Sequence, residues 1–178
     1  MRIEVDAVLG HPREAVFAAY RDDIRALSDY MPNVRRIDVV ERVDEAGVVR
    51  LFNRWHGGVE MPANLAHRLE ERFLSWDDHA IWDQSTWSCE WTIEPHALRE
   101  AVRCKGRIDF VELGGGGRTR IELSGDLTFA LERVRGVPSF LAGSLGRTAE
   151  SFFLRAITAN LVAVNDALAV YLRGDTVA

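Results

Sequence analysis

The sequence predicts a two-layer α+β domain in which an antiparallel sheet of about seven strands packs on one long C-terminal helix. Three observations predict it. Apolar and polar residues alternate along several segments, short turns join most of these segments, and a long apolar helical pattern ends the chain. Strands with such short connections pair in the antiparallel sense. A sheet with one apolar face and a helix with one apolar stripe then bury those surfaces against each other.

The chain begins with an alternating segment, Arg2 to Leu9, which predicts a half-buried strand. Pro12 opens a helix, because a proline suits the first helical position. A second short helix reaches about Tyr30, and Pro32 ends it. The apolar residues at helical spacing in the first of these two helices are Ala15, Val16, Ala19 and Tyr20.

A hairpin is predicted next. A three-residue loop with Gly47 in the left-handed region makes the apolar faces of its two strands coincide. The pairs that this loop sets are Val43–Val49, Glu41–Leu51, Val39–Asn53 and Ile37–Trp55. A helix from about Asn64 fits the stretch that follows best.

Four of the five tryptophans lie between Trp76 and Trp91. A turn at residues 83–86 would pair Trp82 with Trp87 and place Trp87, Cys89, Trp91 and Ile93 on one face of a strand. The run from Trp76 to His79 is either an acid–base cluster or, as we prefer, the start of a strand.

A four-glycine turn, Gly114 to Gly117, closes the last hairpin. It pairs Phe110 with Ile121, Ile108 with Leu123 and Gly106 with Gly125. Two facing glycines indicate the place where a long hairpin bends sharply. A long helix then runs from Ser139 to Arg173, with a narrow stripe of small residues: Ala142, Ala149, Ala156, Ala163 and Ala167.

Length, net charge and cysteine content limit the classes of function that the chain can have. The chain has 178 residues, so we expect one domain over residues 1–178. Its net charge of −5 argues against a nucleic-acid partner, which usually meets a basic protein. Two cysteines without zinc-ligand spacing predict neither a disulfide scaffold nor a metal site, and we expect no cofactor. The most apolar segment, residues 151–172, carries charged and amide side chains, so we expect no stable membrane insertion and a cytoplasmic protein.

The element order resembles the helix-grip fold of the START-like superfamily, also called SRPBCC, which includes polyketide cyclases, coenzyme Q-binding proteins and lipid-transfer domains. The segments that carry the resemblance are RIEVDAVLGHPREAVFAAYRD at one end and SFLAGSLGRTAESFFLRAITANLVAVNDALAVYL at the other. The resemblance implies a curved sheet that wraps the long helix and leaves an apolar cavity for a ligand. It implies no particular reaction, because such a fold hosts enzymes, carriers and receptors.

We expect the ligand-binding residues to lie on the inward faces of the sheet and of the long helix. Large aromatic residues opposite small ones are either complementary core packing or a ligand cavity, and both interpretations stay open. Inward amides need partners, water or a ligand. The expected ligand-binding residues are Asn53, Trp55, Trp82, Trp87, Trp91, Phe110, Phe152, Ala156 and Asn160.

Function is predicted in three ranked forms. The first is binding or carriage of a small apolar or amphipathic molecule such as a lipid, polyketide, quinone or aromatic compound. The second is a cyclase or dehydratase in which a buried Glu41 acts as a general base, although no catalytic triad can be assembled from residue spacing. The third is a protein-interaction domain with a vestigial cavity. The expected partner is a small apolar molecule, and a homodimer is possible.

Overall fold

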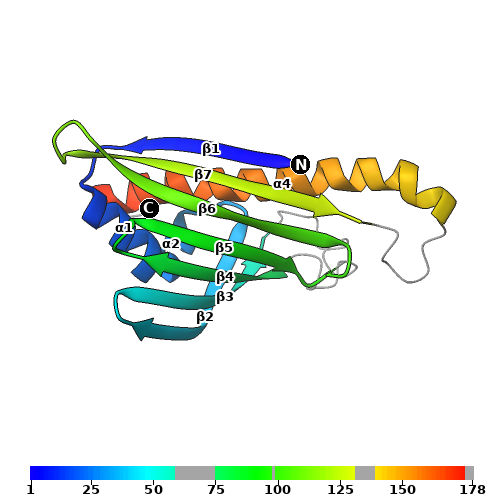
Figure 1. Cartoon of the computed structure of the whole chain (residues 1–178), viewed down its shortest axis with the longest axis horizontal. Coiled ribbons are helices and arrows are strands. Elements are labelled where there is room, and N and C mark those ends of the chain that lie inside the picture. Colours follow the sequence, from blue (N-terminus) through cyan, green and yellow to red (C-terminus); the bar gives the residue numbers. More distant parts are fainter. Residues whose placement is uncertain (59–74, 98, 131–138, 175–178) are drawn as a thin grey trace.

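The predicted sheet and the long C-terminal helix are both present in the computed structural model of the chain (Figure 1). The structure describes residues 1–58, 75–97, 99–130 and 139–174, and within the last range it describes side chains at 154, 155 and 157–174. The helix that the sequence predicts from about Asn64 lies outside these residues. The described elements are β1 (Arg2–Leu9), α1 (Arg13–Asp22), α2 (Ile24–Leu27), a short 3₁₀ helix (Ser28–Tyr30), β2 (Val34–Glu45), β3 (Val48–Gly57), β4 (Ser75–Asp83), β5 (Ser88–Pro95), β6 (Val102–Leu113), β7 (Arg118–Phe129) and α4 (Ser139–Arg173).

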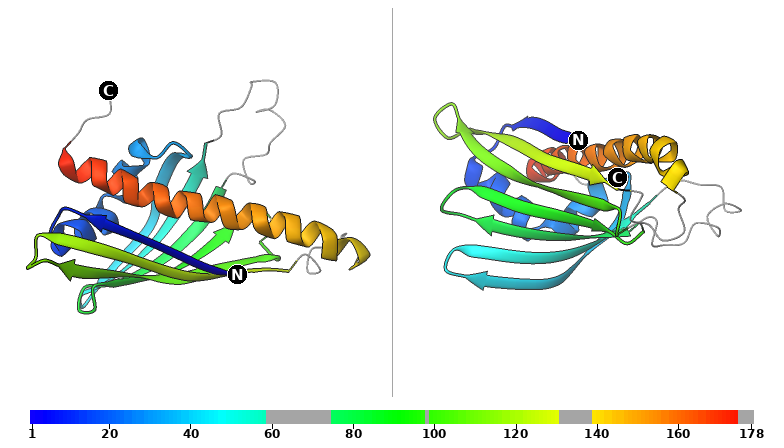
Figure 2. Two further views of the ribbon diagram at one scale, coloured as in Figure 1. Left: turned by 90° about the horizontal axis from the view of Figure 1, so that it is seen from above. Right: turned by 45° about the vertical axis from the view of Figure 1, so that its right-hand side comes forward.

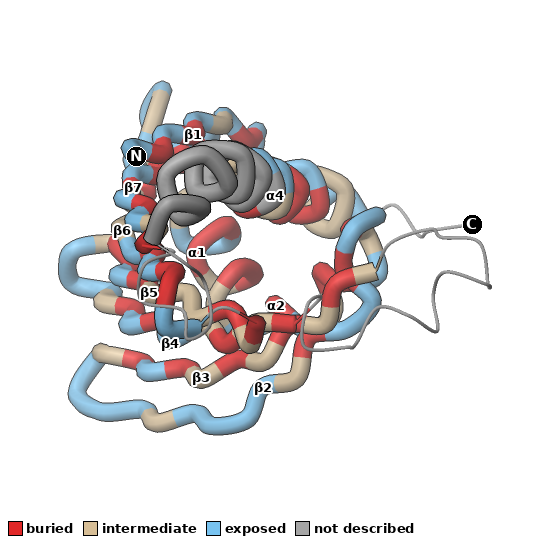
Figure 3. Tube along the Cα trace, turned by 90° about the vertical axis from the view of Figure 1, so that its right-hand side faces the viewer, coloured by how far each residue is buried: buried red, intermediate tan, exposed pale blue. Residues whose placement is uncertain are grey.

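The sheet has seven strands in the order β1-β7-β6-β5-β4-β3-β2, and each neighbouring pair is antiparallel. Strands β2 to β7 form a meander, and β1 joins it beside β7. Figure 2 shows the curved sheet with α4 lying across its concave side and α1 and α2 at one end. The buried stretches of the strands and of α4 face one another (Figure 3). The predicted α+β helix-grip architecture and the bounds of α4 are therefore confirmed.

The β2–β3 hairpin has a shorter loop than the sequence predicts. Ala46 and Gly47 both have positive φ angles, 48° and 86°, as in a two-residue type I′ turn. A bulge between Val39 and Glu41 then shifts the register by one residue. Beyond the bulge the predicted pairs Val39–Asn53 and Ile37–Trp55 are confirmed. Toward the turn the predicted pairs are wrong, since Glu41 pairs with Phe52 and Val43 with Arg50.

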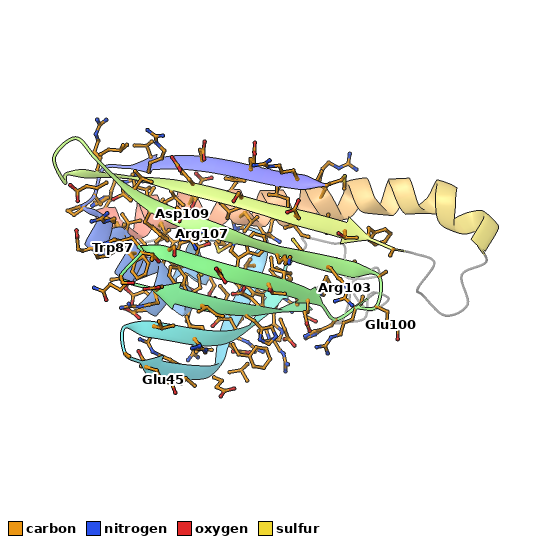
Figure 4. All side chains as sticks on the ribbon, in the orientation of Figure 1. Glu45, Trp87, Glu100, Arg103, Arg107 and Asp109 are labelled. Carbon is orange, nitrogen blue, oxygen red and sulfur yellow. The ribbon has the colours of Figure 1, made fainter. Side chains whose placement is uncertain are left out.

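The β4–β5 hairpin has a longer connection than predicted. Trp82 pairs with Cys89 instead of Trp87. Trp87 lies in the turn with a φ of 53°, a left-handed conformation that its side chain adopts rarely. Figure 4 shows Trp87 at the end of the sheet where β4 and β5 are joined. The predicted common face of β5 therefore begins at Cys89, and Trp87 is not part of it.

The β6–β7 hairpin has the predicted register, including the facing pair Gly106–Gly125. These glycines make room for the indole of Trp91. A β-carbon at Gly106 would lie 2.4 Å from Cζ2 of Trp91 and 2.1 Å from the carbonyl oxygen of Ser124. At Gly125 it would lie 2.8 Å from the same ring. The two glycines therefore let the indole of Trp91 pack directly against the backbone of β6 and β7, which is a use that the sequence pattern did not reveal.

Candidate functional site

A cavity of about 340 Å³ lies between the concave face of the sheet and α4. This volume is near the lower end of the range for small-molecule pockets. Side chains from the sheet, α1, α2 and α4 line it. The aromatic lining residues are Tyr20, Trp55, Trp76, Trp82 and Trp91, the polar ones include Asn33, Asn53, Ser75, Asp78 and Asn160, and the aliphatic ones include Ile24, Leu51, Ala80, Ile93, Ile108, Ile157, Leu161 and Val164.

The aromatic rings of the lining hold one another in place. Trp55 and Trp76, paired across β3 and β4, stack with their ring centroids 5.6 Å apart. Tyr20 of α1 contacts Trp82 edge-on at 5.2 Å. The buried indole Nε1 atoms of Trp82 and Trp91 have no hydrogen-bond partner. A buried donor without an acceptor costs free energy, so these two N–H groups are available to an acceptor atom.

Asp78 and Asn53 form the polar centre of the cavity. They are directly opposite each other on β4 and β3, and Nδ2 of Asn53 donates to Oδ2 of Asp78 over 3.2 Å. Asn53 is 2% exposed, and its Oδ1 has no partner. Alternation along β4 explains the placement, because Trp76, Asp78, Ala80 and Trp82 point to the same side of the sheet.

Burial changes the acidity of Asp78. It raises the pKa of this carboxyl to about 6, and the hydrogen bond from Asn53 limits the rise. Burial also raises the pKa of the nearby Tyr20 and Cys89 well above their usual values, so both stay neutral near pH 7. Among the described lining residues there is no lysine, arginine or histidine. Burial therefore brings the pKa of the Asp78 carboxyl close to neutral pH, and none of the described lining residues carries a cationic side chain.

The neighbouring carboxyl, Asp77, points to the opposite face of β4 and has a different environment. It accepts hydrogen bonds from Nε of Arg54 and from Nε2 of His96, both over 2.8 Å. Burial alone would raise its pKa, but these two partners lower it below the usual value. Nδ1 of His96 lies 2.8 Å from the hydroxyl of Ser75. This Ser–His–Asp chain, which residue spacing did not reveal, ties β3, β4 and the end of β5 together.

The structure brings five of the predicted ligand-binding residues to the cavity: Asn53, Trp55, Trp82, Trp91 and Asn160. Phe110 and Trp87 are not among its lining residues. Both instead contact the ring of Phe17 edge-on, at 5.1 and 5.2 Å, in an aromatic cluster beside α1. The guanidinium of Arg13 also lies 4.4 Å from the ring centroid of Trp87. The side chains of Phe152 and Ala156 lie outside the described residues.

The predicted inward placement of Glu41 is wrong, and the described residues of the small-residue stripe pack in the core instead of facing the cavity. Glu41 is exposed and pairs with Phe52, because the bulge turns it away from the inner face. It is therefore not a buried general base. In the small-residue stripe, Ala163 and Ala167 are buried in the core but do not line the cavity. The helix face toward the cavity carries Ile157, Asn160, Leu161 and Val164 instead.

Sequence reasoning missed Asp78 and Trp76 as lining residues. The signal was present, since Trp76, Asp78, Ala80 and Trp82 alternate along β4 and two of them are tryptophans. A carboxyl between two tryptophans on one face of a strand indicates a buried acid, and a buried acid indicates a function or a partner. The two adjacent aspartates concealed this signal, because the pair is also typical of an exposed strand entry.

Comparison with solved structures shows the same fold over nearly the whole chain. TTHA0849 from Thermus thermophilus is 16% identical, with a TM-score of 0.63, and the match covers 99% of this chain and 100% of that one. The Zhui aromatase/cyclase from Streptomyces sp. R1128 is 15% identical, with a TM-score of 0.65 and coverage of 97% and 96%. Norcoclaurine synthase from Thalictrum flavum is 15% identical, with a TM-score of 0.58 and coverage of 97% and 86%. No family model matches the sequence, and no curated protein matches it.

The protein therefore has the helix-grip fold, as the resemblance predicted. At these identities the likeness concerns the fold, and function has to be argued from the site. Within the described ranges, no group of three or more potential ligand side chains is placed to hold a metal ion. In the same ranges, no helix is both long and apolar enough to cross a membrane.

Proposed function

We propose that the protein binds a small, largely apolar ligand in the cavity between the sheet and α4. The observation that carries this proposal is a cavity of about 340 Å³ whose lining joins indole rings to a few buried polar groups without partners. Apolar walls supply affinity through the area they bury, and isolated polar groups orient the occupant. A solid core would leave neither the volume nor the unpartnered Nε1 atoms of Trp82 and Trp91.

The proposal is tested by filling the cavity from one strand. Ala80 points into the cavity between Leu51 and Trp91, whereas its neighbour Ile81 points outward and is 41% exposed. Ala80→Phe should lower the affinity for 2-naphthaleneethanol, measured by calorimetry, by at least tenfold. Ile81→Phe is the matched control and should bind as the unmodified protein does. Equal affinity of the two folded variants would contradict the site.

Native mass spectrometry of freshly purified protein is the complementary measurement. A co-purifying molecule that leaves with Ala80→Phe but remains with Ile81→Phe would identify the ligand class. A protein that carries no mass adduct and takes up no probe would favour the third reading, an interaction domain with a vestigial cavity.

A cyclase or dehydratase activity is the second candidate, and Asp78 is the observation that favours it. A general base works best with a pKa near the working pH, and burial raises the pKa of Asp78 to about 6. The Nε1 donors of Trp82 and Trp91 would polarise carbonyl oxygens of a substrate. Incubation of an identified ligand with the native protein and with Asp78→Asn, followed by mass analysis, separates carrier from enzyme. A new chemical species formed by the native protein alone would establish the enzyme.

Further proposals concern the location, the partners and the oligomeric state of the protein. We propose a cytoplasmic protein with a small-molecule partner and no nucleic-acid partner, because the net charge of −5 disfavours phosphate binding. A homodimer is also proposed, and analytical ultracentrifugation at micromolar concentration tests it.

A further inference from the structure

The cavity contains a carboxyl group among aromatic rings, with no balancing positive charge on any described lining residue. Besides Asp78, the ionisable residues in the described part of the lining are Tyr20 and Cys89, and burial keeps both neutral near pH 7. An ionised carboxylate in apolar surroundings is costly unless a cation or several hydrogen-bond donors accompany it. Its side-chain partner Asn53 is itself neutral. When Asp78 is ionised, no positive charge on the described lining residues balances it.

The hydrogen-bonding pattern around Asp78 is also incomplete. Because Nδ2 of Asn53 donates to Asp78, the Oδ1 atom of the same amide remains as a buried acceptor without a donor. Two kinds of acceptor oxygen, a carboxylate and an amide carbonyl, thus lie on adjacent strands. A primary ammonium group carries three N–H donors and one positive charge. It can therefore balance the charge of the carboxylate and donate to the unpaired amide oxygen at the same time.

The surrounding rings suit the same chemical group. The stacked pair Trp55–Trp76, with Trp82 and Tyr20, gives the cavity a largely aromatic lining. The faces of such rings attract cations, and aromatic cages of this type are used to recognise amines. Aliphatic residues from α4, such as Ile157 and Val164, complete an apolar wall for the rest of a ligand.

Building on the proposed function, we propose that the cavity selects a lipophilic primary amine. Its ammonium group donates to the carboxylate of Asp78 and to Oδ1 of Asn53, and its ring system lies among the tryptophans. A neutral isostere of the same shape is bound less tightly, because it leaves the carboxylate unbalanced.

The proposal has a pH signature. The groups that face Asp78 are Asn53 and Trp55 from β3, the Tyr20 phenol from α1 and the Cys89 thiol from β5, with His79 beside it on β4. With the pKa of Asp78 at about 6, the acid is ionised at pH 7.5 and neutral at pH 5. Amine binding should therefore weaken as the pH falls through about 6, whereas binding of the neutral isostere should not.

The test compares 2-(2-naphthyl)ethylamine with 2-naphthaleneethanol by isothermal titration calorimetry at pH 7.5 and pH 5. The unmodified protein should bind the amine at least tenfold more tightly than the alcohol at pH 7.5 and lose this preference at pH 5. Asp78→Asn should lose the preference and bind the two probes with similar affinity at both pH values. Glu41→Gln, which removes an exposed carboxyl on the outer face, is the control and should keep the preference.

The outcomes separate this inference from the proposed function. Equal binding of amine and alcohol by the unmodified protein contradicts the inference and leaves the ligand cavity standing. Undiminished amine preference in Asp78→Asn also contradicts it, because the charge would then be recognised elsewhere. Binding of neither probe contradicts the proposed function and this inference with it.

Discussion

The indole of Trp91 lies so close to Gly106 that a β-carbon added to the glycine would be 2.4 Å from Cζ2 of the ring. Trp91 and Gly106 are also paired across β5 and β6, so the ring lies over its own cross-strand partner. Gly125, which faces Gly106 on β7, also contacts the ring, and the two glycines form the platform on which it packs. This contact fixes the ring that forms one wall of the cavity.

Gly106→Ala should therefore be strongly destabilising. The new methyl group would meet the carbonyl oxygen of Ser124 as well as the ring, and backbone atoms cannot move aside cheaply. We expect the free energy of unfolding to fall by about 3 kcal/mol in urea denaturation. Gly117→Ala in the β6–β7 turn is the control, because nothing lies within 4 Å of its β-carbon position. Similar stabilities for the two variants would show that the platform tolerates a side chain.

Asp78→Asn should stabilise the protein at high pH. Burial raises the pKa of Asp78 from 3.8 to about 6, so the folded protein binds this proton more tightly than the unfolded chain. The stability of the unmodified protein therefore declines as the pH rises between these values, and the loss is complete above them. The amide variant avoids the loss, by up to about 3 kcal/mol at pH 8. Urea denaturation at pH 8 and pH 4 measures the difference.

The advantage of Asp78→Asn should disappear at pH 4, where the native carboxyl is itself protonated when folded. Glu41→Gln serves as the control, because Glu41 is exposed on the outer face. A variant that is less stable than the unmodified protein at pH 8 would mean that a cation already balances Asp78.

Asp77→Asn should have the opposite effect. The bonds from Arg54 and His96 lower the pKa of Asp77, so its contribution is present above the usual value of 3.8 and is lost as the pH falls through the lower folded value. We expect the variant to lose about 1–2 kcal/mol of unfolding free energy at pH 7. The gap to the unmodified protein should narrow at pH 2 to 3. Asp109→Asn, which breaks a half-exposed ion pair with Arg107 (both residues are labelled in Figure 4), should change stability by less than about 0.5 kcal/mol.

Glu41→Gln should keep ligand affinity within about tenfold, a change below roughly 1.4 kcal/mol. The bulge after Val39 places Glu41 opposite Phe52 on the outer face, away from the cavity lining. Calorimetry with 2-naphthaleneethanol measures the affinity. A loss greater than tenfold would indicate that the β2–β3 hairpin changes its register when a ligand binds.

The architecture was predictable from the sequence because periodicity and turn chemistry agree in most elements. The alternating strands, the register of Gly106 with Gly125 and the bounds of α4 all follow from local patterns. The bulge near Val40 was not predictable, because a valine suits a regular strand as well as a bulge. Ala46 also weakened the turn signal, since a type I′ turn usually carries asparagine or glycine at that position.

The site was predictable in part. Strand alternation placed Trp55, Trp91 and Asn53 on the inner face, and the structure puts them in the lining. It misplaced Trp87, because a tryptophan at a positive φ is held there by tertiary contacts with Phe17 and Arg13 that no local pattern encodes. The role of Asp78 depends on its burial by distant segments, which a strand pattern indicates only when its neighbours on the same face are taken into account.

Asp77 and Asp78 are consecutive, yet one anchors β4 to its neighbours through Arg54 and His96, and the other faces the cavity. Substitutions on the two faces of this strand can therefore affect separate properties of the protein. Substitutions of Trp76, Asp78 or Ala80 would change the shape and polarity of the cavity, while Asp77 would keep its contacts with Arg54 and His96. One strand thus carries both the contacts that hold it to its neighbours and the side chains that shape the cavity, and the two sets lie on opposite faces, so each can vary without the other.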